Sequence, residues 1–554
     1  MLVLAFTGIS IMLLGGVMTW TSNNASQNQR NNQYFTSVAA AESATEKVIA
    51  MVNRDFQTDG ESLVYANLAN YRAAVPTSSE NAYWSDWRFG DAQGNDGASY
   101  VQRLTSWGWV DLNSQYTGLY GMASTYRVVS NARQLGRPGI VGALRQDFQV
   151  ANIPIFQFAI FYGIEMEISC GQAFNVTGRV HSNNNLWVLP DSALTFQTHV
   201  TAVGNITFSR APGDSRGFPV GSVTYLGEKD AKVAALTLPI GTNNTPDAVH
   251  AILEVPPITE AANSTMGKQR YYNKADMIVV VSNSAVVVTS GRFNTFGTTV
   301  PSAEAALFVK TNGSFYDARQ GKTVKLIDID VEKLRAWSQT NSSLRADLGR
   351  DVRSVYVADR RTLGSSQFGA VRMTNGATLP SMGLTVATEK PIYVKGHFNA
   401  PSAYRGTTNT TATLPASLVG DAITILSEAW TDSNSTSDVS SRNAADTTVN
   451  AAFLAGIVET KTYNVYSGGA ENFPRFLETW GSSRTFTYNG SMVILFPSRF
   501  ATNPWGMSGV YSPPRRNWAF DLNFMEATKL PPGTPEVRTL IRGQWALMAP
   551  SSTE

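Results

Sequence analysis

The chain opens with twenty mostly apolar residues, MLVLAFTGISIMLLGGVMTW, and its first charged side chain is Arg30. As a helix, such a run is roughly 30 Å long at ~1.5 Å per residue, which is enough to cross a bilayer. A cleaved secretion signal starts with a basic segment and ends at a small-residue cleavage site. Because the basic segment is lacking here, we predict an apolar helix that the working protein retains.

Two different stretches follow the apolar run. Residues 21–33, TSNNASQNQRNNQ, are polar and rich in Asn, a poor helix former, so a melted stretch is predicted near them. Beyond it, apolar and small side chains recur at steps of three and four, as on one face of an amphipathic helix. That face consists of Val38, Ala41, Thr45, Val48, Val52 and Phe56. Residues 1–56 are therefore predicted to form an N-terminal helix whose second half packs on a larger domain.

The composition narrows the class of protein. Apolar residues make up 43% of the chain and charged residues 16%, a balance that favours a β-rich extracellular surface. The net charge of +2 is spread along the chain without a block of Lys and Arg, so no nucleic-acid partner is predicted. Cys170 is the only cysteine, which rules out an intrachain disulfide and a thiolate metal cluster. Packing and backbone pairing must therefore supply the stability.

The sequence beyond residue 56 is predicted to form two further segments. Residues 57–150 read as a mixed α/β connecting region, and residues 151–554 as a β-rich domain that ends in an aromatic- and proline-rich cap. Short helices are predicted at residues 331–337 and around residues 416–430. The predicted fold class is α+β, with a long N-terminal helix followed by a large β-rich domain.

A pattern of apolar-x-apolar-x-Gly-x-apolar recurs in the β-rich segment. Its copies begin at Phe174, Val200, Ile392, Ala452 and Phe486. A period of two places the apolar side chains on one face of a strand, and the Gly predicts a bend or a close backbone approach. No fixed interval separates the copies. Two interpretations are equally open: an irregular parallel β-helix with loops of varied length, or ordinary strands that end in turns.

Both ends of the chain resemble a known family. The strings MLVLAFTGISIMLLGG and YFTSVAAAESATEKVIA resemble the N-termini of type IV pilin-like proteins, most closely the large PilX-type pilus-assembly family. The later strings FYDARQGKTVKLIDIDVEKL and NGATLPSMGLTVAT look like the C-terminal parts of large pilin-like proteins. The resemblance implies a pilin-like first helix and a structural subunit of an extracellular filament on the cell surface, inserted in the membrane before assembly.

The resemblance also implies partners and site residues. A leader is removed in this family, so Met1 is expected to be the mature and N-methylated terminus. Other copies of the chain are expected to pack through residues 1–20, and the inner-membrane pilus assembly machinery is the expected partner before assembly. The filament-packing residues are then Met1, Leu2, Leu4, Ala5, Phe6, Ile9, Leu13 and Val17.

One position departs from the family. Major pilins carry Glu at the fifth mature position, where its carboxylate pairs with the terminal amine of a neighbouring subunit, and this chain has Ala5. The first acidic side chain is Glu42. The usual ion pair is therefore not available, and apolar contact is expected to be the main interaction between neighbouring copies. Small residues such as Gly8, Gly15 and Gly16 would let neighbouring helices approach closely.

Few residues suggest catalysis. The histidines are far apart in sequence, and only His181 and His199 would meet if their strands stacked. Asp328 and Asp330 share one face of a strand, like the acids of a calcium site, but pairing with Lys325 or Arg319 is the commoner role. No catalytic, metal or cofactor residue is predicted. Two alternatives to a filament subunit stay open: a membrane-anchored β-helical enzyme acting on polysaccharide, and a carbohydrate-binding adhesin.

Overall fold

The structure is a computed structural model that describes residues 1–91, 93, 95–136, 139–217, 220–291, 297–340 and 342–550. It divides the chain into two compact units, one of residues 1–152 with 538–554 and one of residues 153–537. This division differs from the predicted segments 1–56, 57–150 and 151–554. The C-terminal segment joins the first unit because its strand belongs to that unit's sheet, a long-range pairing that local sequence patterns do not show.

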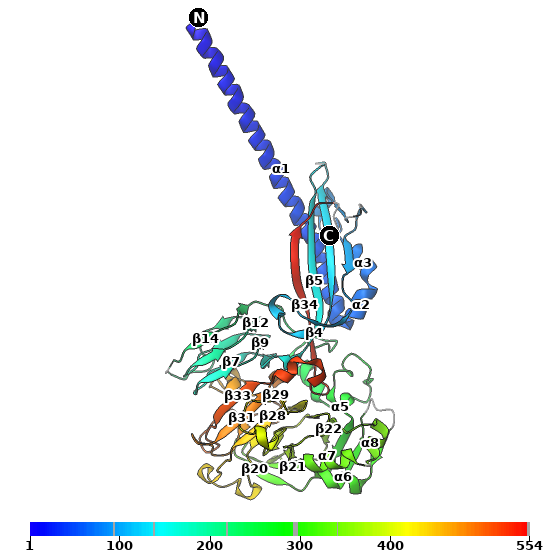
Figure 1. Cartoon of the computed structure of the whole chain (residues 1–554), viewed down its shortest axis with the longest axis vertical. Coiled ribbons are helices and arrows are strands. Elements are labelled where there is room, and N and C mark those ends of the chain that lie inside the picture. Colours follow the sequence, from blue (N-terminus) through cyan, green and yellow to red (C-terminus); the bar gives the residue numbers. More distant parts are fainter. Residues whose placement is uncertain are drawn as a thin grey trace. The chain divides into compact units, whose positions relative to one another are not determined.

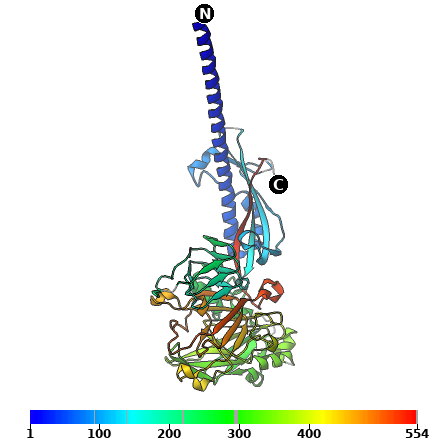
Figure 2. The same cartoon turned by 60° about the vertical axis from the view of Figure 1, so that its left-hand side comes forward.

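The first unit begins with one continuous helix, α1, Leu2–Asp59, the dark blue rod of Figure 1 that Figure 2 shows from another side. Residues 21–33 are helical throughout, so the predicted melted stretch is not present in this structure. Asn differs from the best helix formers by less than about 1 kcal/mol per residue. Since the helix is already formed on both sides, no new nucleation is needed, and this small penalty does not interrupt it.

The second half of α1 docks on the unit, as predicted. The whole predicted face, from Val38 to Phe56, is buried. Val48, Val52 and Phe56 pack in one apolar cluster with residues of the sheet such as Tyr126 and Phe148. A second cluster joins the alanines of the same face to Trp87, Phe89 and Leu144. Burial of this stripe against the sheet is what fixes the helix in the unit.

The rest of the first unit is an antiparallel sheet with two short helices. The helices are α2, Glu61–Ala66, and α3, Leu68–Arg72. The strands are β1, Trp87–Gly90; β2, Tyr100–Arg103; β3, Gly108–Asp111; β4, Tyr120–Gln134; β5, Gly142–Pro154; and β34, Glu536–Leu547. They lie in the order β1-β4-β5-β34, with β2 and β3 also paired to β4. The red β34 therefore lies beside the cyan β5 in Figure 1, although the whole second unit separates them in sequence.

The last strand also holds the helix. Arg542 makes a bidentate ion pair with Glu46 of α1, at 2.6 and 2.7 Å. The Nη1 of Arg538 donates to the carbonyl oxygens of Phe56 and Gln57 at 2.9 and 3.0 Å, near the end of the helix. Since β34 pairs with β5 as well, the two ends of the unit's sequence close one sheet over one helix.

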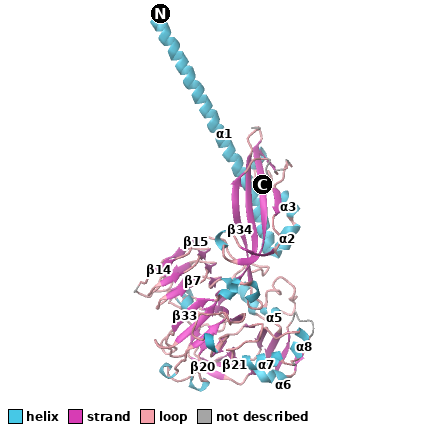
Figure 3. Cartoon of the chain, viewed as in Figure 1, coloured by secondary structure: helices cyan, strands magenta, loops and turns pink. Residues whose placement is uncertain are grey.

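The second unit is built mainly of short strands, drawn in magenta in Figure 3. Its earlier strands are β6, Ile160–Tyr162; β7, Met166–Ile168; β8, Phe174–Val176; β9, Val180–Ser182; β10, Leu186–Val188; β11, Leu194–Phe196; β12, Val200–Ala202; β13, Ile206–Thr207; β14, Val223–Tyr225; β15, Lys229–Ala231; β16, Met277–Val281; β17, Val286–Ser290; β18, Thr299–Val300; β19, Val309–Lys310; β20, Ser314–Asp317; and β21, Lys322–Asp330. Its later strands are β22, Ser354–Asp359; β23, Gln367–Thr374; β24, Leu384–Thr388; β25, Ile392–Lys395; β26, Ala416–Gly420; β27, Ile423–Leu426; β28, Thr447–Asn450; β29, Ala452–Ile457; β30, Arg475–Phe476; β31, Thr485–Gly490; β32, Met492–Pro497; and β33, Arg515–Phe520. Its α-helices are α4, Pro246–His250; α5, Tyr271–Lys274; α6, Ser302–Phe308; α7, Val331–Gln339; α8, Ser343–Leu348; and α9, Thr460–Tyr463.

These strands stack in parallel as the coils of a β-helix. Ile160 pairs with Val180 and Val180 with Val200, so equivalent positions recur every 20 residues in the first coils. β7 and β10, and β8 and β11, pair in parallel with the same interval. The predicted α+β class with a large β-rich domain is thus confirmed, and of its two open arrangements the parallel coils are observed. The paired strands in residues 160–207 recur every 20 residues, although the copies of the glycine pattern do not follow this interval.

The chain enters this stack in its middle. One long sheet has the order β15-β12-β9-β6-β32-β29-β26-β24-β22-β16, so the first coil lies against the last. From β6 the coils proceed to one end at β15; the chain then crosses to β16 at the other end and returns coil by coil to β32. The backbone N–H of Ile155 donates to the carbonyl of Pro535 at 3.0 Å. The two ends of the unit therefore lie side by side, as an insertion between neighbouring strands requires.

The glycine of the pattern follows or ends a strand in most copies, but Gly456 lies inside β29. Phe174 and Val176 lie in β8, whereas Val180 lies in β9, so the four positions are not on one face of one strand as predicted. The predicted close approach is confirmed: a Cβ on Gly178 would stand 2.7 Å from the Phe520 ring. At Gly490, the last residue of β31, a Cβ would stand 2.0 Å from the carbonyl oxygen of Ala451.

One predicted helix is present and one is wrong. The segment predicted at residues 331–337 is α7, which Asp330 caps by accepting from the N–H of Lys333 at 3.1 Å. The segment around residues 416–430 instead forms β26 and β27. Both strands are buried on both faces, and such strands read as continuous apolar runs that helix periodicity does not distinguish.

Gly490→Ala is expected to lower the free energy of unfolding of the second unit by about 1–3 kcal/mol, since the new methyl group meets backbone that must move. Gly506→Ala is the matched control, because a Cβ there meets nothing within 4 Å. Chemical denaturation of both variants measures the difference. Equal stabilities would show that the corner at Gly490 is looser than the structure has it.

Candidate functional site

The surface of α1 ahead of its docked half is the candidate functional site. Each predicted filament-packing residue, Met1, Leu2, Leu4, Ala5, Phe6, Ile9, Leu13 and Val17, is exposed. The exposed fractions of large side chains there are high, for example 78% for Leu4 and 65% for Leu13. A single chain thus leaves the apolar half of its helix uncovered, and which molecule covers it stays a prediction.

This half of the helix is apolar on every side. Phe6, Ile9 and Leu13 follow one face, while Ile11 and Met18 lie on others, and all are exposed. The threonine hydroxyls in this half are already engaged, because Thr7 and Thr19 donate to the carbonyl oxygens of Val3 and Gly15 one turn earlier. A helix that is hydrophobic all round needs cover from lipid or from protein on all sides.

The helix meets the length and composition criteria for crossing a membrane. Its best eighteen-residue window has a mean hydropathy of 2.1, and none of that window is buried inside the chain. Apolar side chains that a single chain leaves exposed to water gain by entering a bilayer or a bundle of like helices. The same exposed surface is therefore compatible with either kind of cover, a bilayer or a bundle of like helices.

The aspartates behind the enzyme alternative have structural partners. Asp328 accepts from the Nε and Nη2 of Arg372 at 2.5 and 3.1 Å, and Arg372 also donates to Asp432 at 2.6 Å. Asp330 caps α7 and lies 3.6 Å from Lys333. The predicted partners Lys325 and Arg319 are not the ones observed. Arg372 was missed because it comes from the neighbouring coil, in register with Asp328.

The two histidines do not form a pair. The Nδ1 of His181 lies 2.8 Å from the Thr201 hydroxyl, and the ring is buried against Phe161. Burial lowers the pKa of His181 to about 4, so it is neutral at physiological pH. His199 lies 3.2 Å from Glu228. Over the residues that the structure describes, no group of three His, Cys, Asp or Glu is arranged to hold a metal ion.

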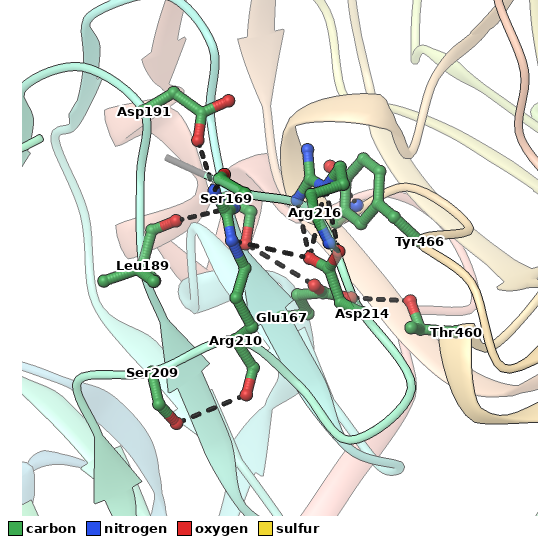
Figure 4. A network of polar contacts seen from close by, with 12 residues as sticks. Glu167, Ser169, Leu189, Asp191, Ser209, Arg210, Asp214, Arg216, Thr460 and Tyr466 are labelled. Carbon is green, nitrogen blue, oxygen red and sulfur yellow. Dashed lines mark hydrogen bonds and ion pairs between the residues drawn. The ribbon is translucent and has the colours of Figure 1, made fainter. Parts of the chain in front are cut away.

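A buried polar network in the second unit, shown in Figure 4, was not predicted from the sequence. Glu167 of β7 is buried, accepts from the Thr460 hydroxyl at 2.6 Å and shares a hydrogen bond with Asp214. Arg216 binds Asp214 at 2.8 Å and places its guanidinium 3.2 Å from the centre of the Tyr466 ring. The only sequence signal was an acid in a strand, because its partners come from the loop around Asp214 and from the start of α9, both distant in sequence.

Proton sharing follows from this geometry. Burial is the largest influence on Glu167 and raises its pKa to about 8; the charges of Glu471 and Asp214 act in the same direction, and the Thr460 hydroxyl opposes them. Burial also acts on Asp214, but its hydrogen bonds with Arg216 hold that pKa below its usual range. Glu167 is therefore protonated at neutral pH and Asp214 is ionised. The network joins the loop around Asp214 and the start of α9 to strand β7 of the β-helix.

Glu167→Gln is expected to remove a pH dependence of stability. A pKa raised in the folded state gives stability that is complete below the unfolded value, 4.5, and is lost as pH rises through about 8. The glutamine amide keeps the hydrogen bonds without the charge, so at about pH 9 the variant should exceed the native chain by roughly 2–5 kcal/mol in free energy of unfolding. Denaturation at about pH 5 and pH 9 measures this.

Glu228→Gln supplies the control for that measurement, since the Glu228 side chain is 72% exposed. It should follow the native pH profile. A Glu167→Gln variant that lost stability equally with the native chain up to about pH 9 would contradict the shared proton.

The fold defines a class of architecture: an apolar-tipped helix docked by its second half on an antiparallel sheet, with a parallel β-helix inserted before the last strand. No protein-family model matches the chain. No curated protein matches it. Among solved structures, the chain is similar to the competence-associated pilin ComZ from Thermus thermophilus, at 11% identity, with 93% of this chain and 98% of that chain covered and a TM-score of 0.31.

Proposed function

We propose that this chain is a structural subunit of an extracellular type IV pilus-like filament, assembled by packing of its apolar N-terminal helix with the β-rich unit displayed outside. The observation that carries the proposal is the contrast within α1. Residues from Ser37 onward are docked on the chain's own sheet, whereas the apolar residues before Thr21 have no cover from the chain. A bundle of such helices supplies cover on all sides at once.

The proposal includes the steps before assembly. The helix holds the chain in the inner membrane, where the pilus assembly machinery is its partner, and Met1 is the N-methylated terminus. Transfer from lipid to a helix bundle exchanges one apolar environment for another, so close packing at Gly8, Gly15 and Gly16 supplies the attraction. Membership of the PilX-type family belongs to this proposal too. It rests on the strings at the two ends of the sequence.

Catalysis forms no part of the proposal. The enzyme alternative rested on Asp328 and Asp330, and both are engaged by neighbouring side chains or by a helix terminus. The adhesin alternative concerns the displayed unit and is compatible with filament membership. Binding of the isolated unit, residues 153–537, to a glycan array would favour it.

Filaments sheared from the cell surface test the proposal. Gold-labelled antibody against residues 153–537 should decorate them along their length in negative-stain electron microscopy. Mass spectrometry of the same material should give an N-terminal peptide that starts at methylated Met1. Label found only on dispersed particles, or an N-terminus beyond residue 20, would contradict the proposed function.

A further inference from the structure

Charged groups are scarce on the exposed part of α1. After the terminal amine, the sequence offers only Arg30 before Glu42. Arg30 is exposed in the projecting half, amid the uncharged amides of residues 21–33. Across the described ranges it forms no hydrogen bond or ion pair with another residue. If helices pack side by side, this guanidinium loses water and must find an acceptor, because an unpaired buried charge is strongly unfavourable.

Glu42 is the nearest acid in the sequence, and its recorded interaction is a longer-range electrostatic one with Arg542. It is exposed, and it has no hydrogen-bond or ion-pair partner in the part of the chain that the structure describes. Its neighbour Glu46, one turn later, is held by both terminal nitrogens of Arg542. Asp55 is buried and accepts from the Tyr71 hydroxyl at 2.8 Å. Glu42 is therefore the first carboxylate of the helix that another molecule can use.

Arg30 and Glu42 of one chain are not able to meet. Twelve residues of α-helix separate them by about 18 Å along the axis and by about 120° around it. That distance exceeds the combined reach of the two side chains. Because the two charges point about 120° apart around the helix, they face different neighbouring copies. A contact that uses different surfaces on its two sides is head-to-tail, and it generates an open filament when it does not close into a ring.

We propose that Arg30 of one copy pairs with Glu42 of the next copy, in parallel helices offset by about 18 Å, and that this pair sets the axial register of the assembly. The inference rests on the proposed function and names its partner, a second copy of this chain. Each copy gives its Arg30 to one neighbour and its Glu42 to another. Such a heterologous contact builds an open filament.

Outside the close packing at its three glycines, the apolar half specifies little of the axial register. Apolar burial is non-directional, so helices covered with Leu, Ile and Val are free to slide past each other with little change in free energy. Ala5 offers no carboxylate to a neighbouring amine. Pairing one positive and one negative charge favours one offset and penalises the others, which leave both charges unpaired.

Charge exchange tests the pair. Arg30→Glu and Glu42→Arg should each lower filament yield at least about tenfold, because like charges then meet, and the double variant should recover to within about threefold of the native yield. Asp59→Arg is the matched control, since Asp59 is an exposed acid on the same helix, and it should assemble normally. All three positions changed are exposed, so folding should be unaffected.

Cross-linking gives an independent measurement. An Arg30→Lys variant keeps the positive charge, and a carbodiimide couples the new amine to a carboxylate in direct contact with it. Applied to assembled filaments of this variant, the carbodiimide should give a ladder of covalent oligomers beyond the dimer, which an Arg30→Lys, Glu42→Gln variant does not give. A head-to-tail contact requires this ladder.

Other outcomes overturn the inference. Native assembly by both single charge variants, no recovery in the double variant, or absence of the ladder from assembled filaments would each do so. In these cases assembly that still required residues 1–20 would leave the proposed function standing. Assembly without residues 1–20 would instead remove the proposed function itself.

Discussion

Deletion of residues 1–20 is expected to give a soluble, folded chain that no longer assembles. None of the most apolar window of α1 is buried inside the chain, so its removal takes no contact from either unit. The docked face from Val38 to Phe56 remains, with the Arg542–Glu46 pair that joins helix and last strand. Circular dichroism and thermal denaturation should match the full chain in detergent.

Filament formation and membrane association should both disappear in that deletion, because the surface that lipid or neighbouring copies would cover is gone. Electron microscopy of the surface fraction and sedimentation of membranes provide the measurements. A deletion variant that still forms filaments would refute the packing role of the helix. One that fails to fold would show that the projecting half supports the domain, contrary to its exposure.

Two substitutions of the same residue type should have opposite effects. Phe56 is fully buried under the sheet, with Trp107 at a ring distance of 6.3 Å and Arg538 over its ring, so Phe56→Ala is expected to cost about 3–5 kcal/mol of stability. Phe6 is 65% exposed, and Phe6→Ala should change the stability of the detergent-solubilised chain by less than about 0.5 kcal/mol.

In filament yield the expected effect falls on the Phe6→Ala variant, whose stability is nearly unchanged. Phe6→Ala should lower filament yield although the chain folds normally, since it removes apolar contact between copies. Denaturant unfolding and filament yield, measured on both variants, test this division of α1 into a docked half and a projecting half. Equal destabilisation by the two substitutions would contradict it.

The helix could be predicted because its signals are local. The apolar run needs no tertiary contact to be recognised, and the spacing from Val38 to Phe56 reports the buried face directly. The same local reasoning failed at residues 21–33, where a modest propensity penalty was outweighed by continuity of the helix. It also failed around residues 416–430, where strands buried on both faces lack the alternation that identifies exposed ones.

Features that depend on contacts between residues distant in sequence could not be predicted. The recruitment of β34 to the sheet of β5 leaves no local mark, because the whole β-helix lies between the two strands in sequence. The 20-residue interval was hidden by a pattern that runs across corners and by the long segment between β13 and β14. For the same reason the sequence did not show that Asp328 faces Arg372 of the neighbouring coil.

Cryo-electron microscopy of filaments sheared from the cell surface tests the central claim most directly. We predict a core made of helices of residues 1–20 from successive copies in close contact, with the β-rich unit outside and no lipid around the helices. A filament whose core lacks these helices, or a native protein found only as a dispersed monomer with residues 1–20 removed or still in the membrane, would contradict the account.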